Sequence, residues 1–130
     1  VLLQPHRSYR DDVRKLLALD AVHGMAHITG GGLPGNVARV IPDGFVAEID
    51  RNAWDVPPVF DYVAEAGHIT DDECYRAFNM GIGFVVAIAP DRLDDVRSEI
   101  EESVVIGRVR SARVPDGARV VLLERRTGRR

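Results

Sequence analysis

The chain has 130 residues and a formal net charge of −3, with 45% hydrophobic and 28% charged residues. This length and apolar fraction predict one globular domain with its own core, and the acidic balance argues against a nucleic-acid-binding protein. The sequence has no apolar run of about eighteen residues and no signal-peptide pattern, so neither a membrane span nor secretion is expected. The single cysteine, Cys74, excludes an internal disulfide and favours a reducing, cytoplasmic compartment.

The two ends of the sequence lead to separate expectations. The first residue is Val1 and not Met, so we expect a processed chain or part of a longer protein. From Arg108 to Arg130 there are eight arginines against Asp116 and Glu124. Such a stretch serves either as a basic arm for an anionic partner or as a solvated terminus. Because no aromatic residue alternates with the arginines, a frayed basic tail over 124–130 is favoured.

The first predicted element is a helix over 8–19. Ser8 and Asp11 are spaced like the two members of a capping box at its start. The apolar side chains that fall on one helical face are Val13, Leu16 and Leu17.

A short buried strand is predicted over 24–29 (GMAHIT) and another over 45–50 (FVAEID), the second after a Pro-Asp-Gly turn. A helix is predicted over 57–67, with Pro58 in its first turn and Gly67 at its end.

The second half of the chain follows the same alternation. A helix over 70–78 begins with Thr70 and Glu73 as a capping box. A β-branched run predicts a strand over 83–90. The remaining predictions are an amphipathic helix over 91–103, which buries Leu93, Val96 and Ile100, and strands over 104–109 and 119–124 around a second Pro-Asp-Gly turn.

These elements together predict an α/β domain of the α+β type, with α/β/α layers around a mixed sheet. The last three strands and their helix suit a ferredoxin-like half.

The stretch from His23 to Val40, HGMAHITGGGLPGNVARV, is the most unusual in the chain. His23 and His27 have the i, i+4 spacing of helical zinc ligands, but the Glu of H-E-x-x-H is absent and three glycines follow at once. A helix is therefore not expected at this point, and no third ligand is evident. We expect no metal to be held by this pair.

The glycines suggest a phosphate-binding loop, although two well-known motifs fit poorly. Gly30, Gly32 and Gly35 formally match G-x-G-x-x-G, and Asp50 lies twenty residues beyond Gly30, as in a dinucleotide fold. The prolines that follow leave room for only a turn or two of helix, however, and the Lys of a P-loop is absent. Two interpretations stay open: an anion cradle built from exposed N–H groups, or a glycine-rich turn without a ligand.

Three motifs in register indicate a family. In chain order these are GMAHITGGGL, IDRNAWDVPPVFDYVAEAG and CYRAFNMGIG. In these three stretches the chain resembles the C-terminal domain of the phosphoribosylformylglycinamidine cyclo-ligase (aminoimidazole ribonucleotide synthetase) family. The opening LLQPHRSY resembles the junction between the family's two domains, and the resemblance runs from about Leu2 to about Val109. Cys74 stands where the family often has Met, a difference between two apolar fillers.

The resemblance implies a reaction of de novo purine biosynthesis. ATP activates the amide oxygen of formylglycinamidine ribonucleotide as an imino-phosphate, and a nitrogen closes the imidazole with release of ADP and phosphate. Magnesium assists, and the ATP and metal sites are built mainly by an N-terminal domain that this sequence does not contain. The expected partners are therefore the ribotide, ATP and that N-terminal domain, within a homodimer and without nucleic acid or membrane.

The resemblance also implies site residues. The backbone of Gly30, Gly31 and Gly32 holds a phosphate, and Thr29 caps the loop or touches that phosphate. His27 donates to the phosphate or moves a proton, or else it is a buried histidine satisfied by the loop.

Two further residues have alternatives of their own. Asn79 offers a rigid amide at a strand mouth, or it only forms a turn. Arg76 pairs with an anionic ligand, or with Asp72 on its own helix. Trp54 and the Pro57-Pro58 pair are expected to pack the domain.

Two other functions remain open from the sequence. One is a non-catalytic module that binds phosphate or a nucleotide. The other is a domain of a sister ATP-dependent synthetase of the same superfamily. In every case we expect the 130 residues to fold but not to catalyse alone, because they contain no P-loop and no evident carboxylate cluster for magnesium.

Overall fold

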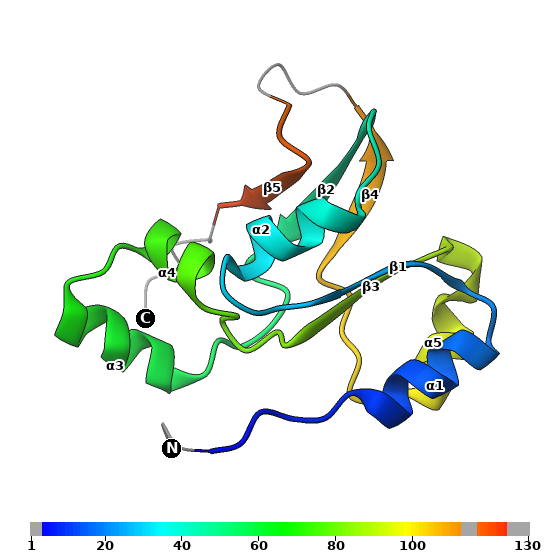
Figure 1. The fold of residues 1–130 in the computed structure, drawn as a ribbon, viewed down its shortest axis with the longest axis horizontal. Coiled ribbons are helices and arrows are strands. Elements are labelled where there is room, and N and C mark those ends of the chain that lie inside the picture. Colours follow the sequence, from blue (N-terminus) through cyan, green and yellow to red (C-terminus); the bar gives the residue numbers. More distant parts are fainter. Residues whose placement is uncertain (1–3, 113–116, 125–130) are drawn as a thin grey trace.

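The computed structural model describes residues 4–112 and 117–124 (Figure 1). Apart from Glu124, the predicted basic tail over 124–130 lies outside the described residues, as do the first two residues of the second Pro-Asp-Gly turn. Within the described ranges, no helix combines the length and the apolar character that crossing a membrane requires.

The strands form two sheets. β1 and β3 pair as an antiparallel ribbon, and β2 is the central strand of a mixed sheet in which β4 runs antiparallel and β5 parallel to it. The strands are β1 (Val22–His27), β2 (Phe45–Asp50), β3 (Phe84–Ile88), β4 (Gly107–Ser111) and β5 (Val120–Leu123).

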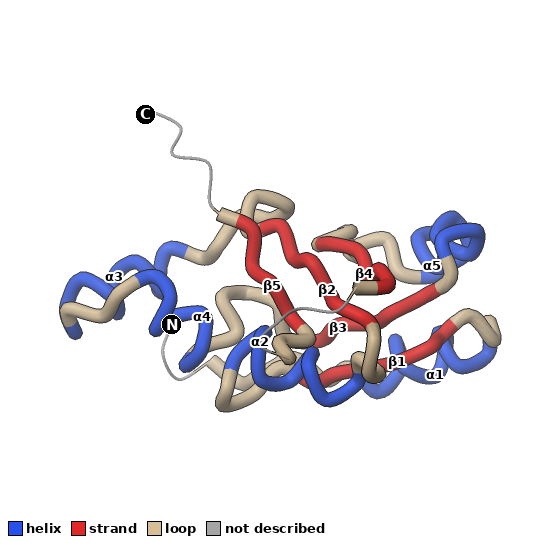
Figure 2. Tube along the Cα trace, turned by 90° about the horizontal axis from the view of Figure 1, so that it is seen from above, coloured by secondary structure: helices blue, strands red, loops and turns tan. Residues whose placement is uncertain are grey.

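The helices lie between the sheets and at both ends of the molecule. α3 and α4 lie at one end, α1 and α5 at the other, and the sheets occupy the middle (Figure 2). The helices are α1 (Arg10–Ala18), α2 (Gly32–Val37), α3 (Pro58–Gly67), α4 (Asp71–Ala77) and α5 (Leu93–Glu99), with 3₁₀ turns η1 (Ala38–Val40) and η2 (Pro90–Arg92).

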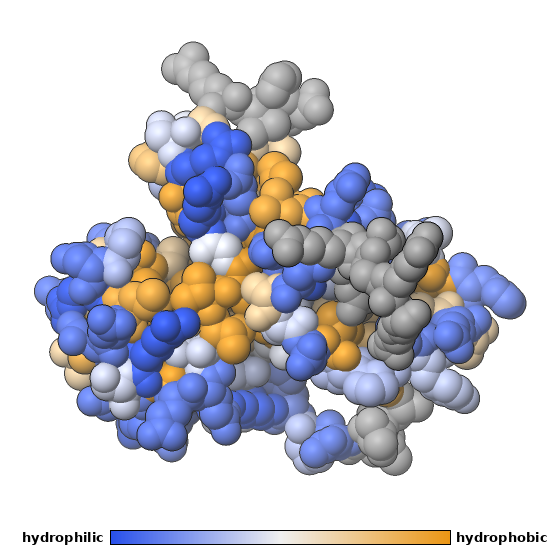
Figure 3. Space-filling model, turned by 180° about the vertical axis from the view of Figure 1, so that it is seen from behind, coloured by the Kyte–Doolittle hydropathy of each residue, from blue (hydrophilic) through white to orange (hydrophobic). Residues whose placement is uncertain are grey.

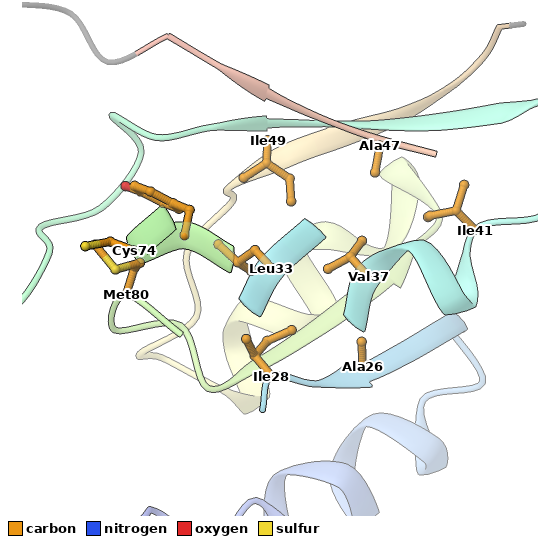
Figure 4. Packing of buried hydrophobic residues seen from close by; sticks show 10 residues of the cluster. Ala26, Ile28, Leu33, Val37, Ile41, Ala47, Ile49, Cys74 and Met80 are labelled. Carbon is orange, nitrogen blue, oxygen red and sulfur yellow. The ribbon is translucent and has the colours of Figure 1, made fainter. Parts of the chain in front are cut away.

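The short helix α2 is the centre of the core. Leu33 and Val37 project from it between Ala26 and Ile28 of the β1 segment and Ile49 of β2 (Figure 4). All of these side chains are buried, so α2 joins the two sheets through apolar contacts on opposite sides. A six-residue helix is marginal alone, so this packing is what stabilises it.

The α+β class and the mixed sheet are confirmed, but the predicted grouping of the last three strands is wrong. β3 pairs with β1, whereas β4 and β5 flank β2. Local pattern predicts where strands lie but does not choose their partners, which depend on the burial of α2 between the sheets.

Two predicted helix starts have different outcomes. The capping box at Ser8 is wrong, because α1 begins at Arg10 with Tyr9 as its N-cap and no side-chain cap hydrogen bond. Leu17, one of the apolar residues on the predicted helical face, is 58% exposed. The capping box of α4 is confirmed: the Glu73 backbone N–H donates to Thr70 Oγ1 at 3.3 Å, and the Thr70 N–H donates to Glu73 Oε2 at 3.0 Å.

β4 begins three residues later than the predicted strand over 104–109. Gly107 pairs with Ile49, and a Cβ at Gly107 would clash with the carbonyl oxygen of Glu48. The ladder therefore starts where the chain can approach β2 closely, while Val104 and Val105 remain exposed.

We expect Thr70→Ala to lower the free energy of unfolding by about 1 kcal/mol, because the first turn of α4 loses its cap. Hydrogen bonds that the Thr70 N–H and hydroxyl donate to the Glu73 carboxylate, at 3.0 and 2.7 Å, lower the pKa of Glu73, and the substitution removes the second of them. A depressed folded-state pKa stabilises the fold above the unfolded pKa, and this contribution is lost as the pH falls through the folded value. Urea titrations at pH 7 and near pH 3 measure both effects. A penalty that does not shrink at the lower pH would contradict the role of the ionised Glu73.

Candidate functional site

The glycine loop follows β1 and leads into α2. Gly31 has φ +96° and Gly32 has φ +59°, backbone conformations that glycine adopts without strain. Gly30 and Gly31 are exposed, and a Cβ built at Gly30 has no neighbour within 4 Å. This part of the predicted phosphate site is therefore open to a ligand.

Gly32 has a different environment from its neighbours. It is buried, and a Cβ at this position would clash with the Tyr75 carbonyl oxygen and lie 3.0 Å from that of Phe78. The third glycine thus lets α2 pack directly on the end of α4. Its packing role is visible in the structure, whereas its predicted role in phosphate binding stays a prediction.

Asn36 fixes the shape of the loop and was missed by the sequence reasoning. Its side-chain Nδ2 donates to the carbonyl oxygen of Gly32 at 2.8 Å, with longer contacts of 3.2 Å to that of Thr29 and 3.3 Å to that of Gly30. The Thr29 hydroxyl donates to Asn36 Oδ1 at 3.4 Å. Asn36 is only 4% exposed. The available signal was the position of Asn36 between Pro34-Gly35 and an apolar residue, Val37. A buried amide at such a position needs hydrogen-bond partners, which the loop carbonyls provide.

His27 lies at the end of β1 with its side chain exposed. Strand alternation directs Ala26 and Ile28 toward α2 (Figure 4) and His27 to the opposite face. There His27 Nε2 lies 3.0 Å from His6 Nε2. The alternative of a buried histidine satisfied by the loop is therefore wrong, while a catalytic role stays a prediction.

The structure also bears on the motifs that fitted poorly. α2 spans six residues before η1 adds a 3₁₀ turn, which confirms that no long helix follows the glycines as a dinucleotide site requires. Asp50, the acidic residue of that motif, accepts hydrogen bonds from the N–H and Nδ2 of Asn52 at 2.9 and 2.7 Å. Its carboxylate thus supports the local turn after β2.

Asn79 and Arg76 belong to the segment that Gly32 contacts. Asn79 Oδ1 accepts from the Gly81 N–H at 2.9 Å, so the side chain supports a turn whether or not it also meets a ligand. Arg76 is exposed on the last turn of α4. The sequence offered Asp72 as a partner of Arg76 in place of a ligand. Among the described residues, Asp72 Oδ1 instead lies 3.3 Å from Arg51 Nη1.

Arg51 is a second residue that the sequence reasoning missed. It is 8% exposed, donates from Nε to the Leu123 carbonyl oxygen at 2.8 Å and pairs with Asp71 at 2.8 Å. The Cζ atom of its guanidinium lies over the ring of Tyr75, 5.4 Å from the ring centroid. Arg51 therefore ties the end of β5 to the start of α4, which is a structural role.

The packing residues behave as predicted. Cys74 is buried, and desolvation raises the pKa of its thiol, as befits an apolar filler. Trp54 donates from Nε1 to the Met80 carbonyl oxygen at 2.9 Å and meets the Tyr75 ring edge-on. Pro57 lies against Gly81, where a Cβ would approach its Cδ to 2.6 Å.

Several known proteins have sequences similar to that of this chain. The cyclo-ligases named phosphoribosylformylglycinamidine cyclo-ligase include those of Ligilactobacillus salivarius (43% identical over 114 residues, 85% of this chain and 33% of the relative) and Bacillus subtilis (41% over 113 residues, 84% and 33%). The enzyme of Methylobacillus flagellatus is 41% identical over 126 residues, 94% of this chain and 36% of the relative. The chain thus spans about a third of the length of these curated relatives.

A family model described as AIR synthase related protein, C-terminal domain, matches residues 3–117, which include the glycine loop, Asn36 and the α4 segment. The match covers most of the described structure, including the β1–β3 ribbon and strands β2 and β4, and ends before β5. The chain therefore belongs to the family of AIR synthase related protein, C-terminal domains.

Proposed function

We propose that this chain is the C-terminal domain of an ATP-dependent cyclo-ligase that converts formylglycinamidine ribonucleotide to aminoimidazole ribonucleotide. The observation that carries the proposal is the open backbone of Gly30 and Gly31, held in shape by the buried amide of Asn36. The names of the relatives support the reaction. ATP and the ribotide both carry phosphates that such a loop can hold.

Each chain residue has a proposed task. The loop backbone from Thr29 to Gly32 positions a phosphate, and Arg76 and Asn79 flank the α4 end that the loop packs against. His27, the last residue of β1 and three residues before Gly30, exchanges a proton with the ribotide at the same end of the ribbon. Because reaction rates in phosphoryl transfer depend on positioning and charge stabilisation, these groups contribute part of one site.

We assign magnesium binding to the part of the cyclo-ligase relatives that this chain does not span. Among the described residues, no three His, Cys, Asp or Glu side chains are grouped so that they can hold a metal ion. In this proposal the domain contributes phosphate positioning and proton transfer, and the N-terminal domain holds the metal.

The N-terminal domain of the same protein is the proposed partner, in a homodimeric, cytoplasmic enzyme. Apolar side chains gather near the middle of the face seen in Figure 3. Exposed large apolar residues include Val104, Val105 and Val109. Exposed apolar area of this kind is typical of surfaces that another domain covers.

The proposal is tested by Gly31→Val in a full-length enzyme that carries this chain. A branched side chain at φ +96° strains the backbone and fills the space beside the loop, so we expect phosphate-bearing ligands to bind at least about tenfold more weakly. Calorimetric titration of ATP and of the ribotide measures this. Gly35→Ala, at an exposed site with no neighbour within 4 Å, is the control. Unchanged affinity for both ligands would contradict the proposal that the glycine loop binds phosphate.

A further inference from the structure

The segment over 4–9, which precedes α1, lies against the end of the β1–β3 ribbon at which β1 finishes and β3 begins. His6 and Tyr9 of this segment approach the backbone of Gly83, where a Cβ would clash with the Tyr9 hydroxyl and lie 3.0 Å from His6 Cε1. Arg7 of the same segment forms ion pairs with α1 and with the turn after α5. The segment is thus held at three of its residues, and it brings His6 to the end of β1.

The contact that results joins two histidine rings. His6 Nε2 lies 3.0 Å from His27 Nε2, with 5.1 Å between the ring centroids. Tyr9 and Phe84 pack beside the His27 ring, with centroids 6.1 and 6.2 Å from its own. Within residues 4–112 and 117–124, His6 is the one partner with which the His27 side chain forms a hydrogen bond. Three rings therefore limit the orientation of His27, and one of them also engages its Nε2 atom.

This hydrogen bond limits where the ring hydrogens can be. Two imidazole Nε2 atoms form a hydrogen bond only when one of them, and not both, carries a hydrogen. Of the two neutral rings, one therefore has its hydrogen on Nε2 and the other has it on Nδ1. In either arrangement His6 occupies Nε2 of His27, and Nδ1 is the ring nitrogen left for another molecule. Because the hydrogen bond at one ring nitrogen sets the state of the other, His6 determines whether His27 Nδ1 is a donor or an acceptor.

We propose that His6 is a positioning residue for His27, which it holds through Nε2 so that Nδ1 is the nitrogen that exchanges a proton with the ribotide. This inference rests on the proposed function, in which His27 transfers that proton. His6 acts through His27 and has no substrate contact of its own. A proton-transfer group that a further side chain orients is a recurrent arrangement in enzymes.

The first test is the tautomer of both rings in the 130-residue chain, read from nitrogen NMR chemical shifts at about pH 8, where free imidazole is neutral. The chain has four histidines, and the signals lost in His6→Ala and in His27→Ala assign the two rings. We expect His6 and His27 to be opposite single tautomers in the wild-type chain. In His6→Ala, the His27 ring should become a mixture of both tautomers. Ring shifts of His27 that stay the same in His6→Ala would overturn the inference.

The second test is turnover of a full-length enzyme that carries this chain. We expect His6→Ala to lower kcat by about tenfold and to change the KM for the ribotide by less than about twofold, because the orientation of a proton-transfer group acts mainly in the transition state. His6→Gln should keep kcat within about threefold of the wild-type value, because a side-chain amide can both donate and accept. Ser8→Ala, at an exposed position of the same segment, is the matched control and should leave kcat unchanged.

A double variant separates this inference from the proposed function. In the His27→Ala background, His6→Ala should have no further effect on kcat, since His6 acts through His27. Equal losses with His6→Gln and His6→Ala, or a full tenfold loss in the His27→Ala background, would overturn the inference and leave the proposed function in place. Full turnover by His27→Ala would contradict the proton-transfer role in the proposed function, and this inference with it. Thermal unfolding of each variant distinguishes loss of the fold from loss of turnover.

Discussion

Gly32→Ala is expected to lower the free energy of unfolding by about 3–5 kcal/mol. The new methyl group would clash with the Tyr75 carbonyl oxygen and press on that of Phe78, and backbone cannot move aside as a flexible side chain can. The residue also has φ +59°, which adds backbone strain for alanine. Urea unfolding followed by circular dichroism measures the change.

Gly35→Ala is the matched control for this prediction, because it lies in the same helix α2 with no neighbour within 4 Å of the new Cβ. It should be neutral or stabilise the fold by up to about 1 kcal/mol, since alanine favours helix. Equal effects of the two substitutions would show that α2 does not depend on close packing against α4.

His27→Ala is expected to reduce turnover of a full-length enzyme that carries this chain by about a hundredfold or more, as loss of a proton-transfer group commonly does. Because the His27 side chain is exposed, the free energy of unfolding should change by less than about 1 kcal/mol. Steady-state ADP release and urea unfolding, measured on the same protein, separate the two effects.

His23→Ala serves as the control on the same strand. His23 is exposed, at the register shift between Val22 and Gly24 in the pairing of β1 with β3. Its replacement by alanine should reduce turnover far less than that of His27. Equal and mild effects of both substitutions would assign His27 a structural role through its contacts with His6 and Phe84.

Sequence pattern located most elements of the fold because their signals are local. β2 has the predicted bounds, and Thr70 with Glu73 forms the predicted capping box. The start of β4 and the partner of β3 could not be predicted in this way. Both depend on which backbone segments approach each other, as at Gly107 and Glu48, and periodicity carries no such information.

The candidate site was predictable in part for the same reason. The glycine triplet signalled an unusual turn, but the sequence could not show that Gly32 is buried whereas Gly30 and Gly31 are exposed. Nor could it place His6 beside His27, twenty-one residues away in sequence, or Asn36 among the loop carbonyls. These contacts arise from tertiary packing.

The central claim is that this chain supplies one domain of a cyclo-ligase site and that another domain completes it. The most direct measurement is ribotide-dependent ADP release, with ATP and magnesium, by the 130-residue chain and by a chimera. In the chimera the chain replaces the matching third of the Bacillus subtilis relative, to which it is 41% identical. We predict release by the chimera and none above background by the folded chain alone. Release by the chain alone, or a folded chimera that binds both ligands but releases no ADP, would contradict the account.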